Sequence, residues 1–461
     1  MSPMPEQPLS PLDGRYRPAV SALGEHLSEA GLNRARVHVE VEWLLYLTDH
    51  EMLGSTRLEP DQARALRQLV AEFGQDDIEE LAQLEATTRH DVKAVEYYLR
   101  RRLADLGLND VAELTHFACT SEDINNLAYA LTIGSAVREV WLPALGRVVD
   151  ALAERAHQHR SVVMLAHTHG QPATPTTVGK ELAVFVSRLR RIVEQIGRVE
   201  YLGKFSGASG TFAAHLAADP SADWPAISRE FVTSLGLDWN PLTTQIEPHD
   251  WQSELYQRIS HANRVLHNFC TDTWTYISMG YYRQVPQAGS TGSSTMPHKI
   301  NPIRFENAEA NLELSSALLD SLASTLVTSR LQRDLTDSTT QRNIGVALGH
   351  SVLALDNLLR GLGEIEVDAA RLAADLDANW EVLGEAIQTV VRAEVTAGRS
   401  SIADPYAMLK ELTRGRRVGQ AELVSFVEGL DIGAEAKARL VALTPTGYAG
   451  LADHLVDYIG D

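Results

Sequence analysis

The sequence predicts an all-α protein of three helical domains, with a central bundle of long helices that oligomerisation completes. Strand signals are scarce, and apolar residues recur with helical spacing over long stretches. Helices of such length cannot bury their apolar stripes alone, which predicts a bundle that other subunits complete. The clearest stripe lies between residues 174 and 202, where the spacing alternates between four and three as in a coiled-coil seam: Val178, Leu182, Phe185, Leu189, Ile192, Ile196 and Val199.

The same periodicity predicts the other elements in order. Residues 1–110 show shorter helical patterns, and a long helix follows over 122–157, with Pro143 as a candidate kink. Residues 203–250 are irregular apart from one helical pattern near 224–235. Long helices are then predicted over 250–283 and after Pro302. Shorter helices with Gly and Pro breaks continue from about 366. The predicted domains are 1–110, 111–365 with the long helices, and 366–461.

Composition narrows the functional classes. The 461 residues include 44% hydrophobic and 22% charged residues, as in soluble globular proteins. The net charge of -20 argues against nucleic acid as a partner, because nucleic-acid binding needs a basic surface. No apolar run is long enough to span a membrane, and Met1–Asp13 has no features of a secretory signal. Cys119 and Cys270 form no disulfide framework, so a cytoplasmic location is expected.

Residues 289–302 carry the densest set of reactive groups. Glycines and prolines there exclude regular helix or strand, so an exposed loop is expected. An ordinary turn-rich connector is the alternative interpretation. The stretch Gly292-Ser293-Ser294-Thr295-Met296-Pro297-His298-Lys299-Ile300-Asn301-Pro302 resembles the signature loop of the fumarase/aspartase superfamily, whose members eliminate fumarate from succinyl compounds.

This resemblance assigns the loop's roles. An elimination needs a base for the carbon-bound proton and fixed donors for the developing carboxylate charge. In the superfamily the serine at this position is the general base, which implies that role for Ser293. Lys299 and backbone N–H groups would stabilise its alkoxide. Asn301 can donate to a substrate carboxylate, and Ser294 is expected to contact substrate.

The general acid is expected to be a histidine. His167-Thr168-His169-Gly170-Gln171-Pro172 precedes the predicted 174–202 helix. A zinc pair is one alternative, although no Cys, His or carboxylate cluster nearby completes such a site. Structural histidines in a turn are another. Resemblance to the motif that holds the general acid in this superfamily favours His169, oriented by the carboxylate of Glu306. The sequence leaves open whether His90 or His169 donates the proton.

Other polar segments suit a polyanionic substrate. Arg15 and Tyr16 lie in a turn before any helix. The triplet Arg89-His90-Asp91 is, on its residues alone, better explained as a helix cap. Thr120-Ser121 is equally ambiguous, because a capped helix start also offers N–H groups to an anion. The donor-rich segment 333–342 suits a phosphate.

Six motifs in order along the chain resemble the adenylosuccinate lyase family, bacterial type. They lie at 10–16, 88–94, 120–126, 167–175, 292–302 and 333–339. The resemblance implies cleavage of two succinyl nucleotides in purine synthesis, each releasing fumarate, by a homotetramer whose active sites are each built from three subunits. It implies no cofactor and no metal. The substrate-binding residues it implies are Arg15, Tyr16, Arg89, His90, Asp91, Thr120, Ser121, Gln245, Ser294, Asn301, Asn307, Arg333, Ser338, Thr339 and Arg342.

Some features weigh against this interpretation or favour others. Ser290-Thr291 departs from relatives, which more often have an acidic and then an aliphatic residue there. Another fumarate-releasing lyase, such as argininosuccinate lyase, is the nearest alternative, but His298 and the phosphate-suited segment 333–342 argue against it. A non-catalytic helical assembly would be expected to have lost Ser293, His169 or Lys299. The glycines of 203–210 match neither nucleotide-loop spacing, so that function is not expected.

Overall fold

The computed structural model describes residues 8–286, 296, 299–413 and 418–460. Helices dominate these residues, as the apolar periodicity predicts, and the described strands form three two-stranded sheets. The chain divides into two compact units. Unit 1 comprises Met1–Gly146, Ile192–His267 and Ala308–Asp356, and unit 2 comprises Arg147–Arg191, Asn268–Asn307 and Asn357–Asp461. The three-domain division of the sequence stays a prediction.

Unit 1 starts with helices grouped around α3 (Glu29–Asp49). Ser28 caps α3, since its Oγ accepts a hydrogen bond from the Gly31 N–H at 3.0 Å. Leu32 and Ala35 of α3 pack against Ala128 of α7 (Ser121–Ala136). The remaining elements wholly within this unit are α1 (Arg17–Val20), α2 (Gly24–Leu27), α4 (Pro60–Ala71), α5 (Gln75–Thr88), α6 (Asp91–Asp105), α10 (Ala213–Ala218), α11 (Trp224–Ser234), α14 (Thr336–Gln341), and the parallel pair β3 (Leu202–Gly203) and β4 (Asp238–Trp239).

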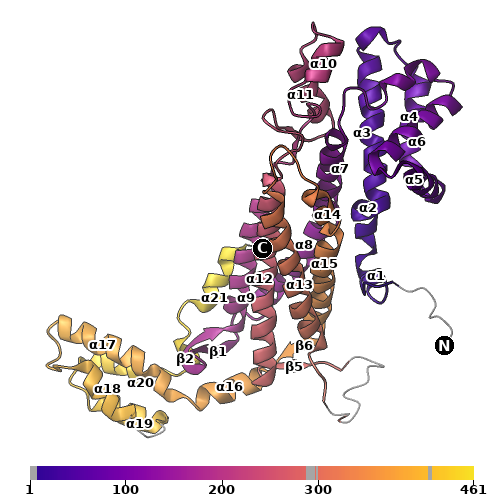
Figure 1. The fold of residues 1–461 in the computed structure, drawn as a ribbon. Coiled ribbons are helices and arrows are strands. Elements are labelled where there is room, and N and C mark those ends of the chain that lie inside the picture. Colours follow the sequence, from indigo (N-terminus) through magenta and orange to yellow (C-terminus); the bar gives the residue numbers. More distant parts are fainter. Residues whose placement is uncertain (1–7, 287–295, 297–298, 414–417, 461) are drawn as a thin grey trace. The chain divides into compact units, whose positions relative to one another are not determined.

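The long helices that the sequence predicts are present with altered ends. They are α8 (Leu142–Gln158), α9 (Val178–Ile196), α12 (Asp250–Ser278) and α13 (Ile303–Leu326) (Figure 1). A further long helix, α15 (Ile344–Gly363), was not predicted. The predicted 122–157 helix is interrupted by a π-helical turn, η4 (Val137–Trp141). Pro143 has no N–H for the carbonyl of Glu139, which accounts for an irregular turn just before it. The predicted 250–283 helix was too long, because α12 ends at Ser278. Gly280 follows with a φ of +77°, a left-handed value that is typical just after the end of a helix.

A chain of buried hydrogen bonds joins the long helices within unit 1. Trp141 Nε1 donates to Ser351 Oγ at 2.8 Å, and Ser351 Oγ donates to Asn263 Oδ1 at 2.8 Å. The chain continues as Asn263 Nδ2 donates to Ser315 Oγ at 3.0 Å, and Ser315 Oγ donates to the Ala347 carbonyl at 2.7 Å. Each of these bonds is buried. Because buried polar groups are costly when unpaired, this polar chain fixes how the helices are paired.

Unit 2 contains a hairpin that the sequence did not predict. β1 (Val163–Thr168) and β2 (Gln171–Thr177) pair antiparallel, so the helix expected from Thr174 begins only at Val178. Pro172 and Pro175 disfavour helix in this stretch, and the β-branched Thr176 and Thr177 suit a strand. The other strands of unit 2, β5 (Tyr282–Gln284) and β6 (Ile365–Val367), also pair antiparallel.

The C-terminal helices of unit 2 share a core of their own. Trp380, Leu383, Ile387 and Val391 pack with apolar residues from later helices. The helices that contribute to this core are α17 (Gly384–Thr396), α18 (Pro405–Thr413), α19 (Gln420–Glu428) and α20 (Ala434–Val441). Unit 2 also contains α16 (Ala369–Asp377) and α21 (Ala452–Leu455). Among the helices that the structure describes, none combines the length and apolar character needed to cross a membrane.

Candidate active site

His169 lies at the tip of the β1–β2 hairpin in unit 2. Thr168 pairs with Gln171, so His169 and Gly170 form a two-residue turn, and both have left-handed φ values of 54° and 72°. Such values are typical of the tight turns that match strand twist, and they place a side chain at an exposed tip. The His169 side chain is exposed, and none of the described residues hydrogen-bonds to it. The hairpin therefore presents an imidazole that is available to a ligand.

The residues after the signature serine lead into α13. Lys299 and Asn301 are exposed and precede the first residue of the helix, Ile303. Glu306 lies in the first turn, where its Oε1 accepts a hydrogen bond from Trp274 Nε1 at 3.2 Å, and Asn307 follows it. The expected pairing of Glu306 with His169 stays a prediction. Ser293 and Ser294, together with Ser290, Thr291 and His298, lie outside the described residues.

Several of the predicted binding residues in unit 1 lie at the N-termini of two helices, α6 and α7. Thr120 is the N-cap of α7 in a reciprocal capping box, in which its backbone N–H donates to Asp123 Oδ2 at 2.8 Å. His90 is the N-cap of α6, and its Nδ1 accepts from the Lys93 N–H at 3.2 Å. The capping interpretation of both segments is thus confirmed. Ser121 Oγ lies 3.5 Å from His90 Nε2, which brings the two N-termini together.

Asp91 connects these N-termini to two arginines. Its Oδ2 accepts from Arg36 Nη2 at 2.7 Å and from Arg342 Nη2 at 3.1 Å, and Arg342 also pairs with Glu29. Arg36 is only 2% exposed and also donates to Asn125 at 2.9 Å. Burial raises the pKa of the Asp91 carboxyl, but the charge of Arg36, with help from the Val92 N–H and Arg342, lowers its pKa overall. Asp91 therefore stays ionised and holds both guanidinium groups.

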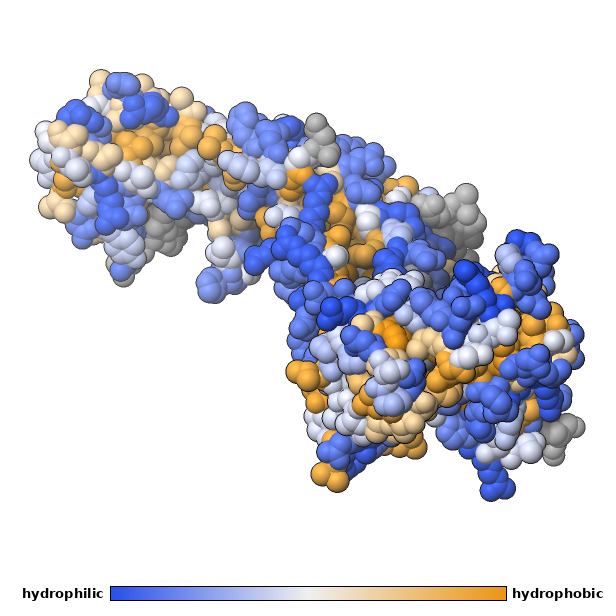
Figure 2. Space-filling view, turned by 90° about the horizontal axis from the view of Figure 1, so that it is seen from above, coloured by the Kyte–Doolittle hydropathy of each residue, from blue (hydrophilic) through white to orange (hydrophobic). Residues whose placement is uncertain are grey.

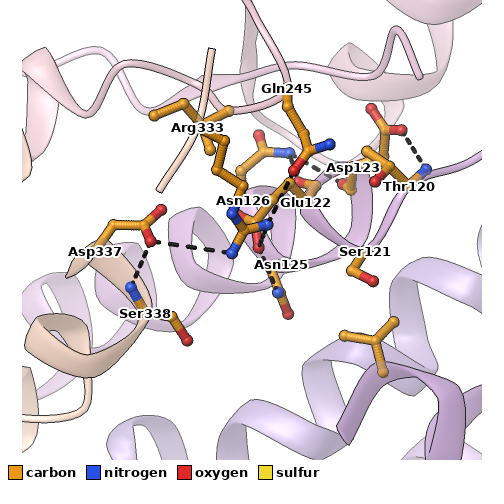
Figure 3. A network of polar contacts seen from close by, with 12 residues as sticks. Thr120, Ser121, Glu122, Asp123, Asn125, Asn126, Gln245, Arg333, Asp337 and Ser338 are labelled. Carbon is orange, nitrogen blue, oxygen red and sulfur yellow. Dashed lines mark hydrogen bonds and ion pairs between the residues drawn. The ribbon is translucent and has the colours of Figure 1, made fainter. Parts of the chain in front are cut away.

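Arg333 is held by acceptors from three segments. Its Nη1 pairs with Glu122 Oε1 at 2.8 Å and lies 3.4 Å from Gln245 Oε1, and its Nη2 lies 4.0 Å from Asp337 Oδ1. Asp337 Oδ1 also accepts from the Ser338 N–H at 2.6 Å. Figure 3 shows this network around Arg333, with Thr120 and Ser121 beside it on α7. Gln245 is thus brought from a distant part of the sequence to Arg333 and Ser338, which belong to one segment.

The remaining predicted residues lie on exposed parts of unit 1. The Arg15 guanidinium stands 5.7 Å from the centre of the Tyr16 ring. Arg89, with a φ of 52°, is exposed between α5 and α6, and Thr339 is exposed on α14. The structure thus brings Thr120, Ser121, His90, Asp91 and Arg342 into one connected group and Arg333, Gln245 and Ser338 into another. Glu122 of α7 connects the two groups, because its Oε1 pairs with Arg333 and also accepts a hydrogen bond from Asn125 at 2.8 Å. Asn125 in turn accepts from Arg36, which binds Asp91.

Arg36 and Glu122 hold the predicted binding residues in place, but neither was predicted from the sequence as a site residue. Arg36 lies in a part of α3 where charged and apolar residues alternate, so its neighbours in sequence give no signal of its burial. Glu122 lies within the 120–126 motif, and the sequence indicates no role for it beyond the start of a helix. Neither its burial nor its contact with Arg333 can be inferred from spacing along the chain.

Comparisons with known proteins agree over nearly the whole chain. A lyase family model matches residues 14–313, and an adenylosuccinate lyase C-terminal model matches residues 329–449. The chain is 49% identical to an adenylosuccinate lyase of Escherichia coli (strain K12) over 451 residues, which cover 97% of this chain and 98% of that protein. It is 47% identical to the Haemophilus influenzae adenylosuccinate lyase, again over 97% of this chain and 98% of the relative.

Solved structures share the fold. A fumarate lyase from Mesorhizobium sp. BNC1 superimposes with a TM-score of 0.74 at 20% identity, covering 95% of this chain and 97% of that one. A 3-carboxy-cis,cis-muconate lactonizing enzyme from Pseudomonas putida gives 0.72 at 21% identity, covering 95% and 96%. The chain therefore shares its fold with these two enzymes. Together with the family models and the full-length relatives, this places the chain in the adenylosuccinate lyase family.

Proposed function

We propose that the chain cleaves adenylosuccinate to AMP and fumarate, and cleaves the succinyl-aminoimidazole-carboxamide ribotide to the corresponding carboxamide ribotide and fumarate. The observation that carries the proposal is identity of 49% over 97% of the chain to a relative named for this reaction. The two connected polar groups of unit 1 support it, because they collect hydroxyl and guanidinium donors of the kind that a succinyl nucleotide needs.

Ser293 is the proposed general base and His169 the proposed general acid. Ser293 removes a proton from the succinyl carbon β to the nitrogen, and the released electron pair forms the carbon–carbon double bond of fumarate. The carbon–nitrogen bond breaks, its electrons pass to the nitrogen, and His169 protonates that nitrogen. The imidazole of His169 is exposed at the hairpin tip and hydrogen-bonds to none of the described residues, which supports this role.

Other groups support these two steps. Lys299 stabilises the Ser293 alkoxide, and Asn301 donates to the carboxylate on which charge develops. Glu306 orients His169 in this proposal, and His90 is the alternative acid. The side chains of unit 1, with Ser294, Asn301 and Asn307, bind the nucleotide and succinyl groups.

A homotetramer with shared active sites is also proposed. Large apolar side chains remain exposed on the long helices, including Val184 of α9, Trp274 of α12, and Ile303 and Leu314 of α13. Hydrophobic residues are also visible among hydrophilic ones on the face drawn in Figure 2. Exposed apolar side chains of this size favour association. The expected location is the cytoplasm, and Cys119 and Cys270, which form no disulfide in the structure, are compatible with it.

The first experiment separates this function from that of argininosuccinate lyase. Purified protein is incubated with adenylosuccinate and, separately, with argininosuccinate, while nucleotide products and fumarate are followed by chromatography. AMP and fumarate from adenylosuccinate alone would support the proposal. Fumarate from argininosuccinate alone would favour the alternative enzyme, and no fumarate from either substrate by an intact assembly would favour a non-catalytic protein.

Shared active sites can be tested by mixing inactive subunits. Ser293→Ala and His169→Ala proteins are unfolded and refolded together, and turnover of adenylosuccinate is measured. If one site takes the serine and the histidine from different subunits, some sites in the hybrid contain both, and activity returns. Hybrids that stay inactive, although mass measurements show mixed tetramers, would contradict shared sites.

A further inference from the structure

A fully buried ion pair lies beneath the N-terminus of α7. Lys204 Nζ stands 2.9 Å from Asp123 Oδ1, and both side chains are 0% exposed. Lys204 Nζ also donates to the Gly207 carbonyl at 2.8 Å. Asn126 bonds the backbone of the same lysine, with its Oδ1 accepting from the Lys204 N–H at 2.8 Å and its Nδ2 donating to the Lys204 carbonyl at 2.9 Å. The cation is therefore built into the protein and has little freedom to move.

The Asp123 carboxylate fastens two segments together. It accepts the Thr120 N–H at 2.8 Å, which closes the first turn of α7. It also accepts the Ser206 N–H at 2.9 Å and the Gly207 N–H at 3.1 Å. Gly207 has a φ of +82°, which L-residues with side chains rarely adopt and which turns its N–H toward the carboxylate. Asp123 thus connects the 203–210 segment to the turn that carries Thr120 and Ser121. Figure 3 shows its contact with Thr120.

The sign of the charge at this position matters for an anionic substrate. Thr120 and Ser121 are proposed to contact a polyanion, and the Asp123 carboxylate hydrogen-bonds directly to one of them. An uncompensated carboxylate there would repel the substrate, and burial would reduce the screening by water. His215 adds little positive charge at neutral pH, because burial, the largest effect, lowers its pKa overall although Asp123 raises it. Lys204 therefore supplies the compensating charge.

We propose that Lys204 is a positioning residue for substrate binding: it neutralises Asp123, so that Asp123 can hold the Thr120–Ser121 turn without repelling the anionic substrate. This inference rests on the proposed function.

The test is a charge cycle at the two positions. Lys204→Met leaves the carboxylate uncompensated, Asp123→Asn keeps an acceptor and two donors without the charge, and the double variant removes both charges. The KM for adenylosuccinate is expected to rise on the order of tenfold or more in Lys204→Met, as Coulomb repulsion at short range predicts. It is expected to fall back toward the wild-type value in the double variant. Asp123→Asn keeps only one of the two acceptor oxygens, so the double variant is its reference: its KM is expected to be no higher than that of the double variant, with kcat changing much less than KM.

A stability control separates this effect from damage to the fold. Trp141→Phe removes a buried hydrogen bond of unit 1 without changing any charge, so it lowers the melting temperature but leaves KM unchanged. If Lys204→Met does not fold, a KM in Asp123→Asn at or below that of the double variant still supports the inference, and a KM clearly above it contradicts the inference.

Two results would overturn the inference: a KM that stays at the wild-type value in folded Lys204→Met, or a raised KM that the double variant fails to lower. Either would assign the pair a purely structural role. A wild-type protein that does not turn over adenylosuccinate would instead contradict the proposed function, so the two failures are distinguishable.

Discussion

The Asp91 carboxylate binds the buried Arg36 guanidinium at 2.7 Å and, through the same oxygen, reaches Arg342 at 3.1 Å. The first contact is protected from water and the second lies near the surface. One acidic residue at the start of α6 therefore holds a cation of α3 and a cation that follows α14. Changes at Asp91 should affect both the folding of unit 1 and the binding of an anion.

Asp91→Asn is expected to lower the free energy of unfolding by about 2 kcal/mol, because it weakens a charge-assisted hydrogen bond to a buried cation. Urea unfolding at one fixed protein concentration measures the change. Asp105→Asn is the matched control on the same helix: that carboxylate is 71% exposed and 3.7 Å from Arg102, so a change within about 0.5 kcal/mol is expected. Equal effects of the two substitutions would contradict the prediction.

The His116–Glu40 pair predicts a dependence of stability on pH. His116 Nδ1 lies 2.6 Å from Oε1 of the fully buried Glu40. Burial lowers the pKa of His116, but the hydrogen bond and charge of Glu40 outweigh it and raise the pKa above its ordinary value of 6.5. A raised pKa adds stability that is fully present below pH 6.5 and is lost as the pH rises through the folded-state pKa.

His116→Asn removes this titration with little backbone strain, since His116 has a φ of 58° and asparagine tolerates that region. The stability difference between wild type and variant should be largest below pH 6.5 and should shrink as the pH rises. Urea titrations from pH 6 to pH 9 measure it. A difference that grows with pH would show that the sign is wrong.

Gly179 is expected to tolerate no side chain. A Cβ there would lie 2.3 Å from the Ala156 carbonyl oxygen and 2.6 Å from the Arg160 Cα, so α9 and the end of α8 would have to separate. Gly179→Ala should therefore lower stability by about 1–3 kcal/mol. At Gly384 a Cβ meets nothing within 4 Å, and the φ is -55°. Gly384→Ala should accordingly be neutral or raise stability by up to about 1 kcal/mol. Thermal unfolding of both variants tests the contrast.

His169→Ala and Ser293→Ala should each lower kcat by about a hundred- to ten-thousandfold, the range typical of a lost general acid or base. Assembly, measured by light scattering, should not change, because the His169 side chain is exposed and makes no hydrogen bond with the described residues. His454→Ala is the control, an exposed histidine outside the proposed site. Full activity in either of the first two variants would reject its assigned role.

The long helices could be predicted because one effect, the burial of an apolar stripe, determines them. An apolar stripe such as Val178 to Ile196 needs a partner surface, and its spacing reveals the helix directly. The β1–β2 hairpin could not be found in this way, because the polar residues from Thr174 to Thr177, just before the apolar stripe, also suit the start of a helix. Its signals were local: two prolines that exclude helix, and a His-Gly pair suited to a tight turn.

The candidate site was predictable where roles follow from residue type. On its residues alone, 89–91 was better explained as a helix cap and 120–121 suited a cap or an anion site equally, because capping depends on neighbours within one turn. The structure shows both caps, and substrate binding at both segments stays a prediction. Arg36, Glu122 and Lys204 depend on contacts with residues far along the chain, such as Lys204 with Asn126, 78 positions away. Spacing along the sequence carries no information on such contacts, so only the fold reveals these residues.

The polar chain that begins at Trp141 has a consequence for the order of folding. Trp141 and Ser351 are 210 positions apart, and Asn263 and Ser315 lie between them in sequence. At about 5–20 residues per second, roughly ten to forty seconds pass between the synthesis of Trp141 and that of Ser351, so the indole N–H lacks its native partner during that time. The early helices cannot complete their native interior in that time. The native interior around Trp141 can therefore form only after the later segments of the protein have been synthesised.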